Sequence, residues 1–518
     1  MSGHSPDDDD RHLAALGYKQ ELVRNLGSFS TFATGFAFIS ILTGMFLLFG
    51  FVYSSGGPAS IWAWVVAVIG QVLFALSFAE LAAKYPLAGS VYSWTKHITR
   101  GTSASWLAGI SMILALIVSS ATVALTMQTI LPAISPVFWI YGDGSGPHDA
   151  TINGVILGSI MLVLTTIVSL LGSKVRSLVN NIGVSVELIA SIVLIVGLAI
   201  NAKHGPSVVF ETNGTGLNQP GGYVGALLLC LLLGLTVMWG FDTAGSLGEE
   251  TINPRQTSPR AIIRALVASG VFGALLILAA VMSIPKLDDQ RIADDGLSYV
   301  VKASLGTGLG NIMLVCAAIA VFVCGLANQT GAVNMMFAMA RDNALPGSSR
   351  LAKVAERAKT PVLPPLIVLV VGVAILVYNI GQPAIFLTVS STTVVFALIS
   401  YFLITASFSL ARVRGDWEQP DTRYFRLGKW GLVVSVVATI WAAGMIVNIA
   451  WPRQVLYNPD EPFHWYLQWG GVLIPAVALT LAFLVYWFTQ RKKIGILPEH
   501  SSGFASQQSA PRAELETR

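Results

Sequence analysis

Long apolar runs dominate the chain and recur along almost its whole length. A helix that crosses a bilayer needs about 20 mostly apolar residues. Twelve runs of this kind lie at 29–53, 60–83, 104–131, 152–172, 181–201, 222–248, 261–284, 309–339, 362–380, 384–411, 430–451 and 468–490. This pattern predicts an all-α polytopic membrane protein with about twelve transmembrane helices.

Lysine and arginine are distributed unevenly between the segments that connect these runs. If the N-terminus lies inside, 26 of the 31 Lys and Arg residues fall in cytoplasmic segments. The outer loops then hold Lys203, Lys286, Arg291, Lys302 and Arg453. Because cytoplasmic loops carry the excess of positive charge, we expect both termini in the cytoplasm and a multi-pass protein in the plasma membrane.

The composition supports a membrane protein and excludes a soluble one. Hydrophobic residues make up 54% of the 518 positions and charged residues only 11%, whereas soluble domains carry about 25% charged residues. The two ends are the polar exceptions. Residues 1–28, with Asp7 to Asp10 in a row, and residues 491–518 are expected to be solvated cytoplasmic tails.

Nothing in the sequence indicates catalysis, a metal site or a bound cofactor. The three cysteines lie inside apolar runs without a C-x-x-C pair, and the seven histidines lack metal-ligand spacing. No nucleophile motif or phosphate-binding loop is present. We therefore expect a protein that is not an enzyme, with no cofactor, metal or nucleic acid, whose surroundings are the lipid bilayer.

A few ionisable and amide side chains lie inside the apolar runs. An ionisable group at the centre of a membrane helix costs at least ~2.5 kcal/mol, so it is expected to face a cavity or a partner. The candidates are Glu80, Glu187, Asp242, Asn328, Gln329, Thr330 and Asn334.

Each candidate has a structural alternative. Glu80 could pair with a basic loop residue, and Asp242 could cap a helix that restarts after a break. The amides of the eighth run could hydrogen-bond between helices. Glu187 lies about 10 Å into the fifth span beyond Asn180; it is either a functional acid or a structural one held by Asn180, Asn181 or water.

The first and sixth runs share small and polar residues in mid-span. These are Ser40, Thr43 and Gly44 in the first run, and Thr236, Gly240, Asp242, Thr243, Ala244 and Gly245 in the sixth. Interrupted helices at matching positions of two halves indicate a transporter site at the interface between repeats. In a five-plus-five inverted repeat, the first and sixth helices correspond.

At these positions the chain resembles the amino acid–polyamine–organocation permeases, over roughly residues 16–490. The resemblance lies in an ordered set of motifs: Leu16 to Leu22, Ile41-Leu42-Thr43-Gly44-Met45-Phe46, Ala79-Glu80-Leu81, Tyr85-Pro86, Gly89-Ser90-Val91-Tyr92, Val179-Asn180-Asn181, Gly240-Phe241-Asp242, Glu249-Glu250, Asn253-Pro254, Pro259 to Ile262 and Ala340 to Pro346. The set is most similar to the amino acid/choline branch, whose members carry amino acids, γ-aminobutyrate, choline and related amines.

The resemblance implies a ten-helix inverted-repeat core at 29–411, two additional helices at 430–490, and alternating access around a midplane site. Three positions differ from the family pattern. Leu42 replaces the first glycine of the family's break. Thr236 stands where many relatives place an aromatic gate, and Glu187 where some relatives carry a lysine thought to replace a sodium ion.

The leading hypothesis is a secondary active permease for amino acids or small amines such as γ-aminobutyrate, coupled to protons, with sodium as the alternative coupling ion. The alternatives are a carrier of organic cations such as choline or polyamines, and a membrane sensor that moves no solute. The predicted substrate-binding residues are Phe38, Ile39, Ser40, Thr43, Gly44, Met45, Thr236, Val237, Trp239, Phe241 and Asp242. The predicted coupling residues are Glu187, Asn328 and Thr330.

Overall fold

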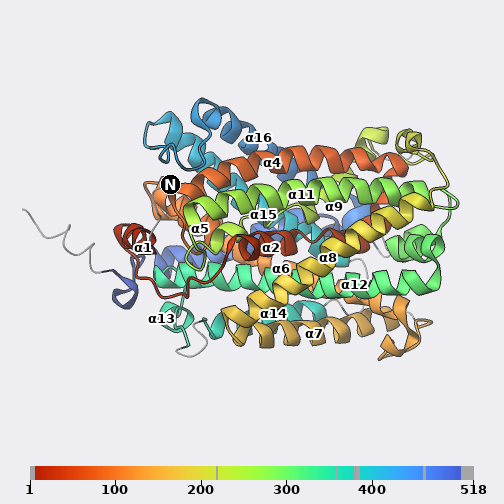
Figure 1. Cartoon of the computed structure of the whole chain (residues 1–518), viewed down its shortest axis with the longest axis horizontal. Helices are drawn as coiled ribbons and strands as arrows, with labels where there is room; N and C mark the ends of the chain where they lie inside the picture. The colour runs from red at the N-terminus through yellow and green to blue at the C-terminus, as the bar shows by residue number, and fades with distance from the viewer. Residues whose placement is uncertain are drawn as a thin grey trace, which may run out of the picture.

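The computed structural model describes residues 6–146, 148–216, 220–355, 360–378, 380, 385–458 and 463–502. Within these residues the chain forms helices and connecting loops, with three isolated β-bridges. The helices run side by side along the long axis of the molecule (Figure 1). Positions 379 and 384 of two predicted spans, and residues 503–518 of the predicted C-terminal tail, lie outside the described residues.

Ten helical segments of the described chain are long and apolar enough to cross a membrane, and two shorter apolar helices complete the predicted twelve spans. In chain order the spans are α2 (Ser28–Ile39) with α3 (Ile41–Gly56), α4 (Ile61–Lys84), α6 (Thr102–Ile134), α7 (Asp149–Leu170), α8 (Ser173–Ile200), α9 (Gly222–Val237), α11 (Pro254–Ser283), α12 (Arg291–Arg341), α14 (Leu363–Tyr378), α15 (Ile385–Val413), α16 (Gly431–Ala450) and α19 (Gly470–Val485). The short helices are α1 (Pro6–Ala15), α5 (Ser90–Ile98), α10 (Thr243–Ser246), α13 (Ser348–Leu351), α17 (Gln454–Tyr457) and α18 (Trp465–Gln468). The fold is the predicted all-α polytopic membrane protein.

Several boundaries differ from the prediction. Helix α8 begins at Ser173 rather than at 181, and α11 begins at Pro254 rather than at 261. Both helices extend through polar and basic residues that a hydropathy pattern excludes from a span. Helix α12 also starts early, and non-helical backbone at Gly296 and Gly306 divides its first residues from the membrane span.

The helix contacts are consistent with two inverted halves. The contact of α2 with α11 corresponds to that of α9 with α4, and the contact of α2 with α8 corresponds to that of α9 with α15. Likewise α7 packs against α12 while α14 packs against α6. The two additional helices lie outside this core, where α16 packs on α15 and α4 and α19 packs on α15.

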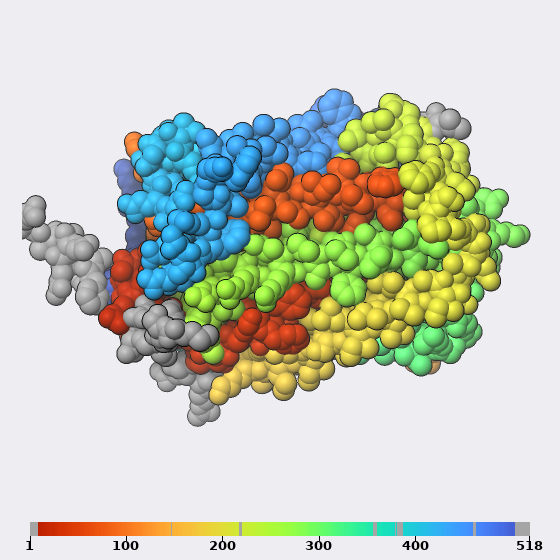
Figure 2. Space-filling model, turned by 45° about the horizontal axis from the view of Figure 1, so that its top comes forward, coloured from red at the N-terminus to blue at the C-terminus, as the bar shows by residue number. Residues whose placement is uncertain are grey.

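One flank of the molecule shows how the bundle meets lipid. Helices α4 (orange), α11 (green) and α8 (yellow) run side by side across it (Figure 2). Each of these helices carries large exposed apolar side chains, among them Ile69 of α4, Val271 of α11 and Ile189 of α8. Exposed apolar side chains of this size are stable in hydrocarbon and promote aggregation in water.

The N-terminal segment corrects the expectation of a solvated tail. In the described residues 6–27, α1 is helical and the backbone beyond it folds against the end of the bundle (Figure 1). Arg24 forms ion pairs with Asp9 at 3.0 Å and Asp10 at 3.1 Å. Asp9 and Asp10 of the aspartate run therefore supply partners for a nearby arginine, which composition alone does not reveal.

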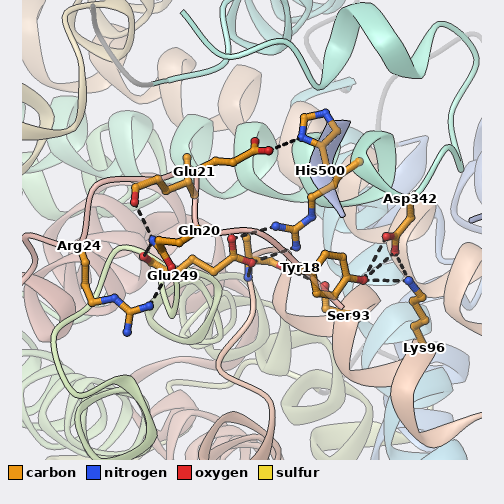
Figure 3. Close-up of polar contacts among 12 residues, drawn as sticks. Tyr18, Gln20, Glu21, Arg24, Ser93, Lys96, Glu249, Asp342 and His500 are labelled. Atoms are coloured by element: carbon orange, nitrogen blue, oxygen red, sulfur yellow. Dashed lines mark hydrogen bonds and ion pairs between the residues drawn. The ribbon is translucent and has the colours of Figure 1, made fainter. Parts of the chain in front are cut away.

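A polar cluster at this end of the bundle, which we call the terminal face, ties the N-terminal segment to the spans (Figure 3). The Tyr18 hydroxyl donates to Asp342 Oδ1 at 3.0 Å, the Tyr92 hydroxyl donates to Oδ2 at 2.9 Å, and Lys96 Nζ lies 2.6 Å from Oδ2. Burial, with the charge of Asp342, raises the pKa of Tyr18 well above its ordinary value. The tyrosine therefore stays a hydrogen-bond donor at all physiological pH values.

A buried ion pair lies beside this cluster. Arg341, near the end of α12, donates two hydrogen bonds of 2.9 Å to the carboxylate of Glu249, in the loop that follows α10. Both side chains are about 1% exposed. The Ala88 backbone N–H also donates to Glu249 at 2.8 Å, and the guanidinium lies 4.0 Å from the centroid of the Tyr18 ring. The terminal face is thus closed by contacts between distant parts of the chain.

Residues 493–502, here called the C-terminal strap, cover the same contacts. The backbone N–H groups of Gly495 and Leu497 donate to carbonyls at the end of α12, at 3.0 and 2.9 Å. His500 Nδ1 lies 2.7 Å from the Glu21 carboxylate in the N-terminal segment. The strap therefore bridges the N-terminal segment and the end of the eighth span.

We predict that Arg341→Gln lowers the thermal stability of the purified protein. The substitution leaves the Glu249 carboxylate buried without a charged partner, which costs about 3–5 kcal/mol. Tryptophan fluorescence during heating in detergent measures the effect. The double variant Arg341→Gln with Glu249→Gln should recover part of the loss. Arg350→Gln, at an exposed position, is the matched control; equal melting temperatures for Arg341→Gln and wild type would contradict the prediction.

Candidate substrate-binding site

The first span breaks at Ser40, between α2 and α3. Ser40 has a φ of 31°, and its backbone N–H donates to the Phe36 carbonyl at 2.9 Å, which ends α2. Its side-chain oxygen accepts from the Thr43 N–H at 3.4 Å and lies 2.6 Å from the Thr43 hydroxyl. Serine is a preferred N-cap residue, so the sequence at this position both ends one half-helix and begins the next.

Glu187 of α8 completes this break. Its Oε1 accepts a hydrogen bond of 2.8 Å from the Ser40 hydroxyl and one of 3.4 Å from the Leu42 backbone N–H. The side chain is fully buried, and its Oε2 has no hydrogen-bond partner within the described part of the chain. A carboxylate at this position faces the positive end of the α3 half-helix. Asn180 and Asn181, the alternative partners, instead donate to Thr34 and Ser30.

The sixth span breaks between Val237, where α9 ends, and Thr243, where α10 begins. Gly240 lies in this break with a φ of 76°, and a Cβ atom there would approach the Phe38 ring to 1.8 Å. The break therefore requires glycine for both its backbone conformation and its contact with the first span.

The two breaks pack directly against each other. The rings of Phe38 and Trp239 meet edge to face with centroids 5.0 Å apart. A Cβ atom on Gly44 would lie 2.0 Å from Val237 Cγ2, so Gly44 is a close-packing residue in this conformation. A bulky substitution at Gly44 would disturb this packing whether or not a substrate binds there.

A small cavity of about 30 Å³ lies at the junction of the breaks. This volume holds on the order of one water molecule, so an amino acid requires the cavity to widen. The residues that line it are Phe38, Ile39, Thr43, Gly44, Leu47, Ser119, Thr122, Val123, Thr236, Val237, Trp239, Cys324, Asn328, Ser390 and Thr393. The cavity thus brings together α2, α3, α6, α9, α12 and α15.

Most of the residues that the sequence singles out border this cavity. They are Phe38, Ile39, Thr43, Gly44, Thr236, Val237, Trp239 and Asn328. Ser40 and Glu187 lie directly behind it, at the break of the first span. The remaining predicted residues are Met45, Phe241, Asp242 and Thr330, which are not among its lining residues.

Asp242 lies at the far end of the break, next to α10, and contacts a different set of partners. Its carboxylate accepts from the Ser90 hydroxyl at 2.7 Å and from the Tyr401 hydroxyl at 2.6 Å. Phe241 packs beside Tyr401 with ring centroids 5.8 Å apart. Asp242 occupies the N-cap position of α10 but makes no side-chain capping bond. The backbone turn at Gly240 separates these residues from the cavity.

The polar residues of the eighth span have different roles. Gln329 donates to the Thr166 hydroxyl of α7 at 2.7 Å, so it hydrogen-bonds between helices as the alternative interpretation proposed. Thr330 donates to the Leu326 carbonyl within its own helix and lines a separate small cavity near Arg176. Asn328 alone among these three borders the cavity at the breaks.

Two groups of hydroxyl residues border the cavity and were not predicted. Ser119 and Thr122 lie on α6, and Ser390 and Thr393 lie on α15. In the sequence they belong to clusters of serine and threonine in the middle of apolar runs, at 119–122 and 390–393. Such clusters resemble ordinary helix contacts, so the signal is present but not distinctive.

The structure also bears on Glu80 and on a possible metal site. Glu80 forms an ion pair with Arg412, so the alternative to a functional role was right about a basic partner, although Arg412 lies in the last turn of α15 and not in a loop. Among the described residues, no group of three or more His, Cys, Asp or Glu side chains is arranged to hold a metal ion.

Comparison with known proteins agrees with this architecture. Residues 28–491 match the family model described as amino acid permease. The chain is 27% identical to the amino-acid permease BAT1 of Arabidopsis thaliana, over 92% of this chain and 95% of the relative. It is 26% identical to the BAT1 homolog of rice, over 94% and 96%. It is 29% identical to the branched-chain amino acid permease BcaP of Bacillus subtilis, over 67% and 73%.

These matches confirm the resemblance to the amino acid–polyamine–organocation superfamily. The family and these relatives are transporters rather than enzymes. A multi-pass membrane protein with two broken helices around a shared cavity is the architecture expected of such a transporter. The chain belongs to the amino acid permease family.

Proposed function

We propose that the chain is a secondary active permease that moves amino acids across the membrane by alternating access. The observation that carries the proposal is the cavity at the junction of two broken spans, bordered by Thr43, Thr236 and Asn328. Backbone without helical partners is tolerated at membrane depth only where protein or a cavity satisfies it. The names of the relatives, all amino-acid permeases, support amino acids as the substrate class.

The proposed orientation places both termini in the cytoplasm and the protein in the plasma membrane. The asymmetric distribution of Lys and Arg supports it. In that orientation the terminal face is cytoplasmic, and the contacts of Arg341 with Glu249 keep the inner side closed. Opening toward the cytoplasm then requires these contacts to separate.

Glu187 is proposed to couple transport to protons. Full burial of a carboxyl group disfavours its charged form, and the Glu187 side chain contacts the first break through Ser40 and Leu42. Protonation removes the negative charge from the positive end of α3. The half-helix then offers its N–H groups to the carboxylate of an incoming amino acid. In this scheme proton binding and substrate binding favour one another.

We predict that Glu187→Gln retains exchange of substrate across proteoliposomes but loses accumulation driven by a pH gradient. Glutamine keeps the shape of a protonated glutamate and cannot release a proton. Uptake of a labelled amino acid, with and without an imposed gradient, measures both activities. Glu211→Gln, at an exposed outer position, is the control. If Glu187→Gln accumulates substrate with the wild-type pH dependence, Glu187 is not the coupling residue, and the polar cluster at Asn328 to Thr330 is the next place to test.

Thr236 is proposed to widen the range of substrates. It stands where many relatives place an aromatic gate, and it borders the cavity. A threonine leaves more room than an aromatic ring and adds a hydroxyl group. Longer substrates such as γ-aminobutyrate are therefore expected to be accepted beside α-amino acids.

We predict that Thr236→Phe narrows the substrate range toward small α-amino acids. The ring fills the space that a longer substrate needs, so inhibition by γ-aminobutyrate should weaken more than tenfold while inhibition by alanine changes little. Competition against a labelled substrate in proteoliposomes measures the inhibition by γ-aminobutyrate and by alanine. Val224→Phe, on the exposed face of the same helix, serves as control. The same competition profile for Thr236→Phe and wild type would count against this role.

The two alternative functions predict different sites and different assay results. A carrier of organic cations would use an aromatic cage with a nearby carboxylate. Phe38 and Trp239 border the cavity, whereas Asp242 is bonded to Ser90 and Tyr401 away from it. A sensor that moves no solute would bind an amino acid without uptake into proteoliposomes, so the same assays separate it from a carrier.

A further inference from the structure

Three polar atoms around the cavity have no hydrogen-bond partner within the described chain. They are Thr236 Oγ1 of α9, Asn328 Oδ1 of α12 and Ser390 Oγ of α15. Asn328 is 1% exposed and Ser390 is fully buried. Buried polar atoms are nearly always paired, so several unpaired atoms that border one cavity call for an explanation, such as a water or a ligand that binds there. Their convergence from three helices on one cavity marks a polar subsite.

The hydrogen-bonding capacity of these atoms is defined by their surroundings. The Asn328 amide nitrogen donates to the Cys324 carbonyl at 3.0 Å, which directs the Oδ1 atom away from that carbonyl. Oδ1 is an acceptor only, and the hydroxyls of Thr236 and Ser390 can each accept as well. By contrast, the neighbouring hydroxyls of Thr122 and Thr393 donate to carbonyls of their own helices. All three atoms of the subsite can therefore accept a hydrogen bond.

We propose that this subsite selects amino acids whose distal end donates hydrogen bonds, over aliphatic amino acids of the same size. The distal groups are a hydroxyl, a carboxamide or the terminal amine of γ-aminobutyrate. The proposal rests on the proposed function, because it names the substrates of the same cavity. Among the described residues that line the cavity, none carries a charged side chain, so hydrogen bonds, rather than an ion pair, recognise the distal group.

The selection follows because an aliphatic side chain would leave the three acceptor atoms of the subsite unpaired. A site built to hydrogen-bond its substrate strongly rejects the analogue that lacks the polar group. Threonine and valine differ only in a hydroxyl and a methyl group, and asparagine and leucine are similar in shape. For these two pairs we expect a preference of at least about tenfold for the polar member.

Competition in proteoliposomes that contain the full chain tests the proposal. Threonine, valine, asparagine and leucine compete with a labelled substrate, and ligand-induced shifts of the melting temperature report binding independently of transport. Wild-type protein should prefer threonine to valine and asparagine to leucine. The variants Thr236→Val and Ser390→Ala should each reduce these preferences, and the double variant should bring them close to parity.

Thr392→Val is the matched control. The Thr392 hydroxyl is also buried without a partner in the described chain, but it is not among the lining residues. The wild-type preference should persist in this variant. A wild-type preference for valine over threonine and leucine over asparagine would refute the proposed subsite. Wild-type preferences that persist unchanged in the double variant would refute it as well.

Failure of the proposed function gives a different result. A wild-type protein that moves no amino acid, yet is stabilised by threonine more than by valine, retains the subsite and refutes the permease. Uptake with aliphatic preference refutes the subsite and retains the permease. If no amino acid is either transported or bound, both proposals fail.

Discussion

The structure depends on the rule that backbone polar groups inside a membrane must find partners within the protein. In the described chain, ten of the twelve spans satisfy this rule with a continuous helix. The first and sixth spans do not, and the side chains around them supply what the helix lacks. Ser40 and Glu187 complete one break, and Tyr401 accepts from the Gly240 N–H at 2.9 Å in the other. The location of the cavity follows from these two exceptions.

The sequence was sufficient to predict the bundle because hydropathy reports burial in lipid directly. All twelve spans were identified, and the small residues at Ser40 to Gly44 and Thr236 to Gly245 marked the breaks. Helix ends were predicted less well, since α8 and α11 continue into polar residues beyond the membrane. Hydropathy also missed the folded N-terminal segment, because its ion pairs and its few scattered buried apolar residues, such as Leu13 and Leu22, form no long apolar run.

The candidate site was predictable to the extent that it lies on the two broken spans. Phe38, Thr43 and Trp239 border the cavity as expected from their positions in the chain. Ser390 approaches from a helix that is distant in sequence, and only tertiary structure brings it there. Asp242 was predicted to bind substrate and does not border the cavity, because the backbone turn at Gly240, two positions earlier, directs its side chain toward Ser90. Local sequence therefore identified the broken helices but not the direction of the side chains beyond them.

The C-terminal strap also bears on how the protein is made. His500 contacts Glu21, a residue 479 positions earlier in the chain. Synthesis proceeds from the N-terminus, so the contact between His500 and Glu21 cannot form until the strap itself has been synthesised. All the spans that precede the strap are made before that contact can form. A nascent chain that stops short of the strap consequently carries an incomplete terminal face, and synthesis of the strap is the step that supplies the missing contacts.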